Sequence, residues 1–255
     1  MSKRTAIIST VAVLLTLLCV GAGFLVVDRL DNYARKLCDE GRQLEEEVAS
    51  ERDPWKAKNM YERAVANYEW AGIILRVLQD RGGQASTLNS LGIVHATHGE
   101  YSKAVESYNR SLVIKRELGW TWAEGNSLAN LGFLHRQFGQ YSNSAECLKQ
   151  SIEKYEGIPS MVMVGRTQCE LAITYGYLEE YSKAMECLRK ALDVAESLGD
   201  THGQARALYF LSSLHAFLGE YEKAYQYAET YLAIPEKIRR EVVGPVDHEE
   251  SCSFQ

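Results

Sequence analysis

Residues 91–108 read LGIVHATHGEYSKAVESY, and the same phrase returns every forty residues. It recurs as LGFLHRQFGQYSNSAECL at 131–148, as LAITYGYLEEYSKAMECL at 171–188 and as LSSLHAFLGEYEKAYQYA at 211–228. The tyrosines inside the phrase, with one more upstream, keep this spacing without a slip: Tyr61, Tyr101, Tyr141, Tyr181 and Tyr221. Self-similarity at a fixed period of about 20–50 residues is the signature of a protein built from stacked repeats.

Each copy of the phrase contains two helical runs joined by a turn. Leu88, Leu91 and His95 have the spacing of one face of an α-helix, and a second run begins at Tyr101. The turn falls at Gly99, because glycine adopts the left-handed conformation that closes a helix. Its counterpart in the fourth copy is Glu179. We therefore expect the fourth turn to be made differently or under slight strain.

A small residue follows the central leucine of each first helix, and its lack of bulk favours close packing of two helices. Glycine in a helix interior costs about 1 kcal/mol relative to alanine, so a packing gain must offset it. The four positions are Gly92, Gly132, Ala172 and Ser212.

The pattern L-G-x-x-H-x-x-x-G-x-Y-x-x-A-x-x-x-Y at 91–108 resembles the tetratricopeptide repeat (TPR). It is most similar to the forty-residue subclass of Pins-type polarity adaptors and many bacterial TPR proteins, and the resemblance covers residues 55–235. It implies an all-α, right-handed superhelical solenoid of helix-turn-helix repeats. Four full repeats are expected, after a degenerate first one at 55–83 whose first helix is not recognisable. They span 84–120, 121–160, 161–200 and 201–240, and a short cap at 236–243 closes the last one.

Residues 5–27 carry no charge, and Lys3 and Arg4 precede them. A helix of this length spans about 34 Å, which is enough for a hydrocarbon core of roughly 30 Å. We interpret residues 1–27 as an N-terminal transmembrane helix, an uncleaved signal anchor. The alternative is a secretory signal peptide cleaved after Ala22, because Val20 and Ala22 satisfy the small-residue spacing.

The side of the membrane on which the repeats lie is a separate question. A short N-terminal tail with two cations is hard to translocate, which favours an extracytoplasmic repeat domain. Cys147 and Cys187 fall in adjacent repeats, about 10 Å apart, too far for a disulfide. Free thiols are commoner in reducing compartments, so the cytoplasmic side stays open. We expect residues 28–54 to form a charged connecting helix and 241–255 to be a disordered tail.

The residue pattern offers little support for catalysis, cofactors, metals or nucleic acid. Neither a glycine-rich phosphate loop nor a Cys-x-x-Cys pair nor a nucleophile elbow occurs in the sequence, and we predict a non-enzymatic protein without cofactors. His95, His135 and His215 share one repeat position, but neighbours about 10 Å apart cannot share one metal ion. A net charge of −6 without a basic stripe argues against nucleic-acid binding.

The most informative positions are those on the first helices that face away from the partner helix. Counting 100° per residue places them on the concave side, where members of the TPR family bind peptides. Arginine, amide and aromatic side chains gather there, which suits an extended peptide carrying carboxylates. The candidate groove residues are Asn89, Asn126, Phe133, Arg136, Gln137, Arg166, Tyr177, Arg206, Tyr209 and Phe217.

Within this set, Arg206 has no acidic residue within a helical turn and is predicted to await an anion from a partner. Arg166 has Glu170 at i+4, and pairing between them is the alternative to partner binding. The groove could also be filled by the protein's own terminal helix.

The sequence thus predicts a membrane-anchored, non-catalytic scaffold that holds a protein or peptide in its groove, and the arginines favour acidic groups on that partner. The alternative is an assembly factor or chaperone-like subunit of a membrane complex that acts through lateral or convex surfaces.

Overall fold

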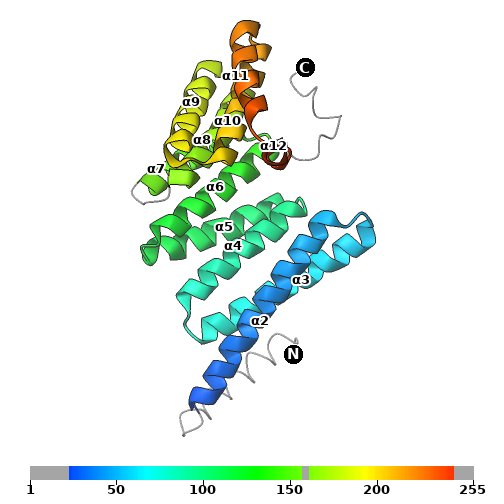
Figure 1. Ribbon diagram of the computed structural model, residues 1–255. Helices are drawn as coiled ribbons and strands as arrows, with labels where there is room; N and C mark the ends of the chain where they lie inside the picture. The colour runs from blue at the N-terminus through cyan, green and yellow to red at the C-terminus, as the bar shows by residue number, and fades with distance from the viewer. Residues whose placement is uncertain (1–22, 157–160, 244–255) are drawn as a thin grey trace. The chain divides into compact units, whose positions relative to one another are not determined.

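The computed structural model describes residues 23–156 and 161–243, and every regular element in these ranges is an α-helix (Figure 1). Most of the helices succeed one another as hairpins, which confirms the all-α prediction. Their bounds are α2 (Gly23–Ser50), α3 (Pro54–Val77), α4 (Arg81–Thr97), α5 (Tyr101–Glu117), α6 (Thr121–Gln137), α7 (Tyr141–Glu156), α8 (Met161–Tyr177), α9 (Tyr181–Leu198), α10 (Thr201–Phe217), α11 (Tyr221–Ala233) and α12 (Glu236–Val243).

The chain divides into two compact units, residues 1–114 and 115–255. The first contains α2, α3, α4 and most of α5, and the second contains α6 to α12. In each unit the second helix of one hairpin packs against the first helix of the next, as α3 does on α4 and as α7 and α9 do on α8 and α10. This is the stacking that a fixed repeat requires.

The turns within the hairpins follow the glycine positions of the sequence. Gly99, Gly139 and Gly219 adopt φ of 77°, 72° and 76°, the left-handed conformation expected of them. Glu179 closes the α8–α9 turn with φ 60°. The fourth turn is therefore made in the same way by a residue with a side chain, at a cost of about 1–2 kcal/mol.

The small residues of the first helices do permit close packing. A β-carbon placed on Gly92 would lie 2.6 Å from the ring of Tyr108 on α5, and one on Gly132 would lie 2.8 Å from Cγ of Leu148 on α7. Contacts below about 3 Å between carbon atoms are not tolerated, so each glycine is required by a large side chain on the facing helix.

Residues 28–54, expected to form a charged connecting helix, are also part of the first hairpin. They lie mostly in α2, which packs along α3 as the first helix of a hairpin. Gly41 of α2 faces the ring of Tyr68, with an added β-carbon 2.9 Å away, as Gly92 faces Tyr108. The missing first helix of the degenerate repeat is therefore α2.

The helices of this hairpin are longer than those of the others, so its first helix, α2, does not fit the forty-residue pattern. Tyr61 lies seven residues inside α3, whereas Tyr101, Tyr141, Tyr181 and Tyr221 each begin their helix. Helix α3 begins instead at Pro54, after Asp53, whose carboxylate accepts hydrogen bonds from the amides of residues 55 and 56. Gly41 and Tyr68 are consequently 27 residues apart in sequence, against 16 for Gly92 and Tyr108.

The ends of the chain are described only in part. The short cap predicted at 236–243 is α12, and residues 244–255 lie outside the described ranges. Residues 5–22 of the predicted membrane span also lie outside them, and residues 23–27 begin α2. Among the helices that the structure describes, none combines the length and the apolar character needed to cross a bilayer.

The packing at Gly92 predicts an inversion of the usual effect of glycine-to-alanine substitution. Gly92→Ala should destabilise the protein by about 1–3 kcal/mol, because the new methyl group collides with Tyr108. Gly72→Ala is the matched control: its β-carbon would lie 3.8 Å from Thr87, so it should stabilise by up to about 1 kcal/mol. Urea unfolding followed by circular dichroism measures both, and equal stabilisation by the two changes would contradict the packing argument.

Candidate functional site

Nine of the ten predicted groove residues lie in the second unit, on the first helices of its three hairpins. Helix α8 packs directly against both α6 and α10, so these helices form one continuous surface, called below the α6–α8–α10 face. Five of the nine side chains are exposed and four are half-buried. The exposed ones are Phe133, Gln137, Arg166, Tyr177 and Phe217, and the half-buried ones are Asn126, Arg136, Arg206 and Tyr209.

An ion-pair network centred on Glu170 connects the three helices of this face. Arg136 of α6 donates from Nη2 to Glu170 Oε2 at 2.7 Å and from Nη1 to the Glu170 backbone carbonyl at 3.2 Å. Arg206 of α10 donates from Nη1 to the other carboxylate oxygen at 3.1 Å. One carboxylate on the middle helix therefore binds an arginine from each neighbour.

The network overturns two expectations about the arginines. Arg206 does not await an anion from a partner, because Glu170 of the preceding repeat supplies one. Glu170 does not pair with Arg166, its i−4 neighbour, since both of its carboxylate oxygens bind arginines of adjacent helices. The i, i+4 rule considers a single helix, whereas stacked helices bring residues 34 and 36 positions away equally close.

Arg166 is exposed, and in the part of the chain that the structure describes no ion pair involves it. Arg166, rather than Arg206, is therefore the arginine of this face that is exposed to solvent without an ion pair.

Asn126 and Tyr209 are engaged within the protein. Asn126 accepts a hydrogen bond of 2.6 Å from the Tyr155 hydroxyl of α7, and Tyr209 packs on Tyr231 of α11 with ring centroids 5.8 Å apart. The terminal helix also covers part of α10: α12 packs against it, and Glu241 binds His202 at 2.8 Å. The protein's own terminal helix thus covers part of α10, beside His202, Ala205 and Leu208.

The exposed aromatic side chains each pack against another side chain of the protein and remain partly exposed to solvent. The Tyr177 ring stacks on Tyr141 at 4.8 Å with a 2° interplanar angle, and Phe217 packs against Tyr181 at 5.4 Å. The Arg136 guanidinium lies 5.2 Å from the centroid of Phe133. Phe133 and Tyr177 each remain 45% exposed, which makes them available to a partner.

Three further residues belong to this face, although the sequence pattern did not single them out as groove residues. Glu170 was considered only as a partner of Arg166. Trp122, one turn before Asn126, and Val162, one turn before Arg166, are 51% and 43% exposed. Their i−4 spacing from the predicted residues was available in the sequence, but the apolar pattern did not show which of them stay uncovered.

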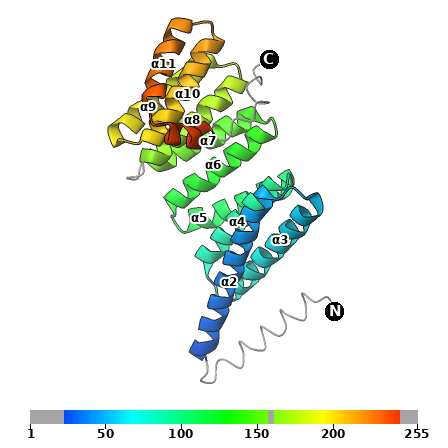
Figure 2. The same cartoon turned by 45° about the vertical axis from the view of Figure 1, so that its right-hand side comes forward.

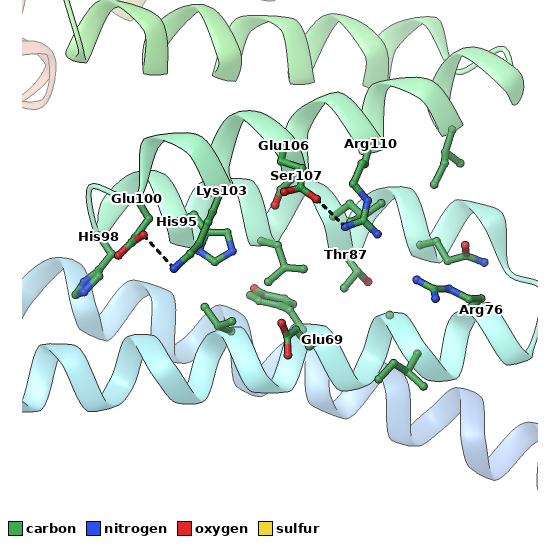
Figure 3. Close-up of a pocket in the computed structure, with 18 of the residues that line it drawn as sticks. Glu69, Arg76, Thr87, His95, His98, Glu100, Lys103, Glu106, Ser107 and Arg110 are labelled. Atoms are coloured by element: carbon green, nitrogen blue, oxygen red, sulfur yellow. Dashed lines mark hydrogen bonds and ion pairs between the residues drawn. The ribbon is translucent and has the colours of Figure 1, made fainter. Parts of the chain in front are cut away.

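The first unit contains the tenth predicted residue, half-buried Asn89 on α4, and a separate groove on the side of the second helices. Its cavity of about 1080 Å³ lies between α3 and α5 with α4 as its floor (Figure 3). Tyr61, Val65, Leu88 and Leu91 contribute apolar surface.

Charged groups of both signs line this groove and are unevenly spread along it. His95, His98, Glu100 and Lys103 gather at one end, and Arg76 and Arg110 lie at the other (Figure 3). The Lys103 ammonium, 3.0 Å from Glu100, lowers the pKa of that carboxyl, and burial lowers the pKa of His95. The two shifts favour the neutral imidazole of His95 and the charged carboxylate of Glu100.

The recurring histidines do not converge: His135 and His215 make hydrogen bonds within their own hairpins, and His95 makes one to the preceding hairpin. Nδ1 of His135 lies 3.0 Å from Gln140 and Nδ1 of His215 lies 2.8 Å from Glu220, whereas His95 meets the Tyr61 hydroxyl at 3.1 Å. Across residues 23–156 and 161–243 no group of three His, Cys, Asp or Glu side chains is arranged to hold a metal ion.

The described cysteines are free thiols with weak reactivity. Burial raises the pKa of Cys147 and Cys187 to about 11 and that of Cys169 to about 12. The nucleophilic thiolate is therefore scarce at neutral pH.

The Glu170 network predicts that its arginines stabilise the fold more than Arg166 does. Arg136→Ala should cost about 2–3 kcal/mol, because it removes two charge-assisted hydrogen bonds from a side chain that is only 12% exposed. Arg166→Ala, on the same face but without an ion pair, should change stability by no more than about 0.5 kcal/mol. Thermal unfolding monitored by circular dichroism compares them, and equal losses would show that the network contributes nothing.

Comparison with known proteins places this geometry among repeat proteins. Family profiles described as tetratricopeptide repeat match residues 125–158 and 163–237. Comparison with curated proteins found no significant match.

Three solved structures illustrate the likeness in fold. BtubC (BKLC) from P. vanneervenii has a TM-score of 0.62 at 16% identity, over 86% of this chain and 92% of that one. RapI in its apo form gives 0.65 at 20% identity, over 71% of this chain and only 50% of RapI. The kinesin light chain TPR-like repeats of Podosopora anserina give 0.63 at 18% identity, over 81% and 96%. The small-residue hairpins, the turns and the profile matches agree on a tetratricopeptide repeat fold, and residues 125–158 and 163–237 match that family.

Proposed function

We propose that this protein is a non-catalytic scaffold that binds a protein or peptide on the α6–α8–α10 face. The exposure of large apolar side chains there carries the proposal: Trp122, Phe133, Val162 and Tyr177 are each at least 43% exposed on adjacent first helices. Large apolar side chains exposed on a folded domain mark a candidate interaction site, and members of the tetratricopeptide repeat family bind peptides on their first helices.

The expected ligand differs from the one that the sequence suggested. Because Glu170 already binds Arg136 and Arg206, the face offers aromatic side chains with Arg166 at one side rather than a pair of arginines. A peptide with apolar anchors and a single carboxylate near Arg166 suits this arrangement, since aromatic anchors dominate the binding energy of such surfaces.

The groove between α3 and α5 favours a second candidate function, assembly through the surface of the second helices. Its cavity of about 1080 Å³ has an apolar floor and ends at Arg76 and Arg110, which suits a segment of a larger complex.

One capture experiment separates the two candidates. Phe133→Ala combined with Arg166→Ala should weaken partner binding at least tenfold without changing the melting temperature, because both side chains are exposed. The matched control is Trp55→Ala with Arg189→Ala, which removes an exposed aromatic and an exposed arginine elsewhere. Partners are retrieved from solubilised membranes and their affinities measured. If only Arg76→Glu with Arg110→Glu abolishes capture, the assembly function replaces the peptide-binding one.

We also propose that residues 5–27 anchor the chain in a membrane, with the repeats on the extracytoplasmic side. The uncharged run of sequence supports this anchor. The full-length chain should stay in the membrane pellet after carbonate extraction, and a reporter fused after Gln255 should report the extracytoplasmic side. A mature N-terminus at Gly23 would show instead that the segment is a cleaved signal peptide.

A further inference from the structure

The last hairpin of the second unit leaves an apolar helix face uncovered. Tyr221, Tyr225 and Leu232 of α11 are 73%, 69% and 59% exposed, and Ala228 lies between them. Their spacing of i, i+4, i+7 and i+11 places the four side chains on one stripe of the helix, called below the α11 stripe.

The same positions are covered in the preceding hairpins. Forty residues upstream, Met185 and Leu188 of α9 are 8% and 2% exposed, and eighty residues upstream Ala145 and Leu148 of α7 are 5% and 1% exposed. The first helix of the next hairpin covers Ala145 and Met185, since α7 packs on α8 and α9 packs on α10, whereas Leu148 packs against Gly132 of its own hairpin.

Helix α11 has no such neighbour among the described residues (Figure 2). Helix α12, which follows it, packs on α10 instead, with Ile238 and Val242 near Ala205 and Leu208. The equivalent sides of α7 and α9 are packed against α8 and α10. The α11 stripe is therefore suited to an amphipathic helix of the same kind.

The charged residues beside the α11 stripe indicate which charge a helix bound there should carry. On α7, Lys149 reaches the covering helix and lies 5.7 Å from the ring centroid of Tyr175 on α8. The equivalent residue of α9 is Arg189, whereas α11 carries Glu229, and Glu222 lies two turns earlier on the same flank. The position beside the stripe is therefore basic in the two covered hairpins, at Lys149 and Arg189, and acidic in the uncovered one, at Glu229.

We propose that the α11 stripe binds an amphipathic helix of another protein that has an apolar stripe and a basic residue facing Glu229. A second copy of this chain suits the site less well. Two α11 helices packed antiparallel about a twofold axis would bring Glu222 of one copy beside Glu229 of the other, and like charges oppose pairing.

The probe is a synthetic helical peptide with the sequence of α8, Met161–Tyr177, because α8 covers the α7 stripe. In one version Tyr175→Lys places a cation where Lys149 meets α8, and in the other Tyr175→Glu places an anion there. The lysine peptide should bind the full-length chain about tenfold more tightly than the glutamate peptide, as fluorescence anisotropy measures it. Glu229→Lys in the protein should reverse this preference.

Substitutions on α11 locate the binding. Tyr225→Glu with Leu232→Glu should abolish binding of the lysine peptide, whereas Thr230→Glu, which adds charge to another exposed side of α11, should leave it unchanged. Circular dichroism should be the same for all variants because the replaced side chains are exposed.

Three outcomes would overturn the proposal. Neither peptide binds, which leaves the stripe as a bare end of the repeat stack. If the peptides bind but Glu229→Lys does not reverse their order of affinity, the bound helix needs no basic residue facing Glu229. Light scattering shows a dimer that Tyr225→Glu with Leu232→Glu dissociates, which makes a second copy the occupant.

Discussion

The structure depends on one recurring contact, a small residue of the first helix against a large residue of the second. Gly41, Gly92 and Gly132 meet Tyr68, Tyr108 and Leu148 at distances that no β-carbon would allow. Close packing fixes how the two helices of a hairpin lie, and that fixes which sides are left for the neighbouring hairpins. Because a β-carbon would collide at these three positions, the gain in packing there outweighs the conformational freedom that glycine loses on folding.

Stacking of identical units also decides what polar groups do. Arg136, Glu170 and Arg206 occupy different positions in their repeats, and they meet because adjacent first helices lie side by side. A half-buried carboxylate between two arginines holds three helices together and removes both arginines from partner binding. The exposed aromatic residues are thereby left as the main chemical feature of this face.

Because the hairpins repeat, the uncovered surface of α11 can be compared with the equivalent covered surfaces of α7 and α9. A stripe that is buried in α7 and α9 but open in α11 has a known complement, which an isolated apolar patch would lack. The exchange of Lys149 and Arg189 for Glu229 then distinguishes the expected partner from another helix of the same kind. Ends of repeat stacks differ from their interiors because no neighbour constrains their side chains.

The sequence by itself determined the helices, their turns and their resemblance to tetratricopeptide repeats, because these rest on spacing within about forty residues: the tyrosine period, the glycines at φ near 70° and the small-residue positions. It placed nine groove residues on one helical surface, since 100° per residue is a local rule. Only the tertiary structure decided that α2 completes the first hairpin, which an extension had moved out of register. Only the tertiary structure showed that Glu170 binds Arg206, because that contact joins separate helices and no period within one helix encodes it.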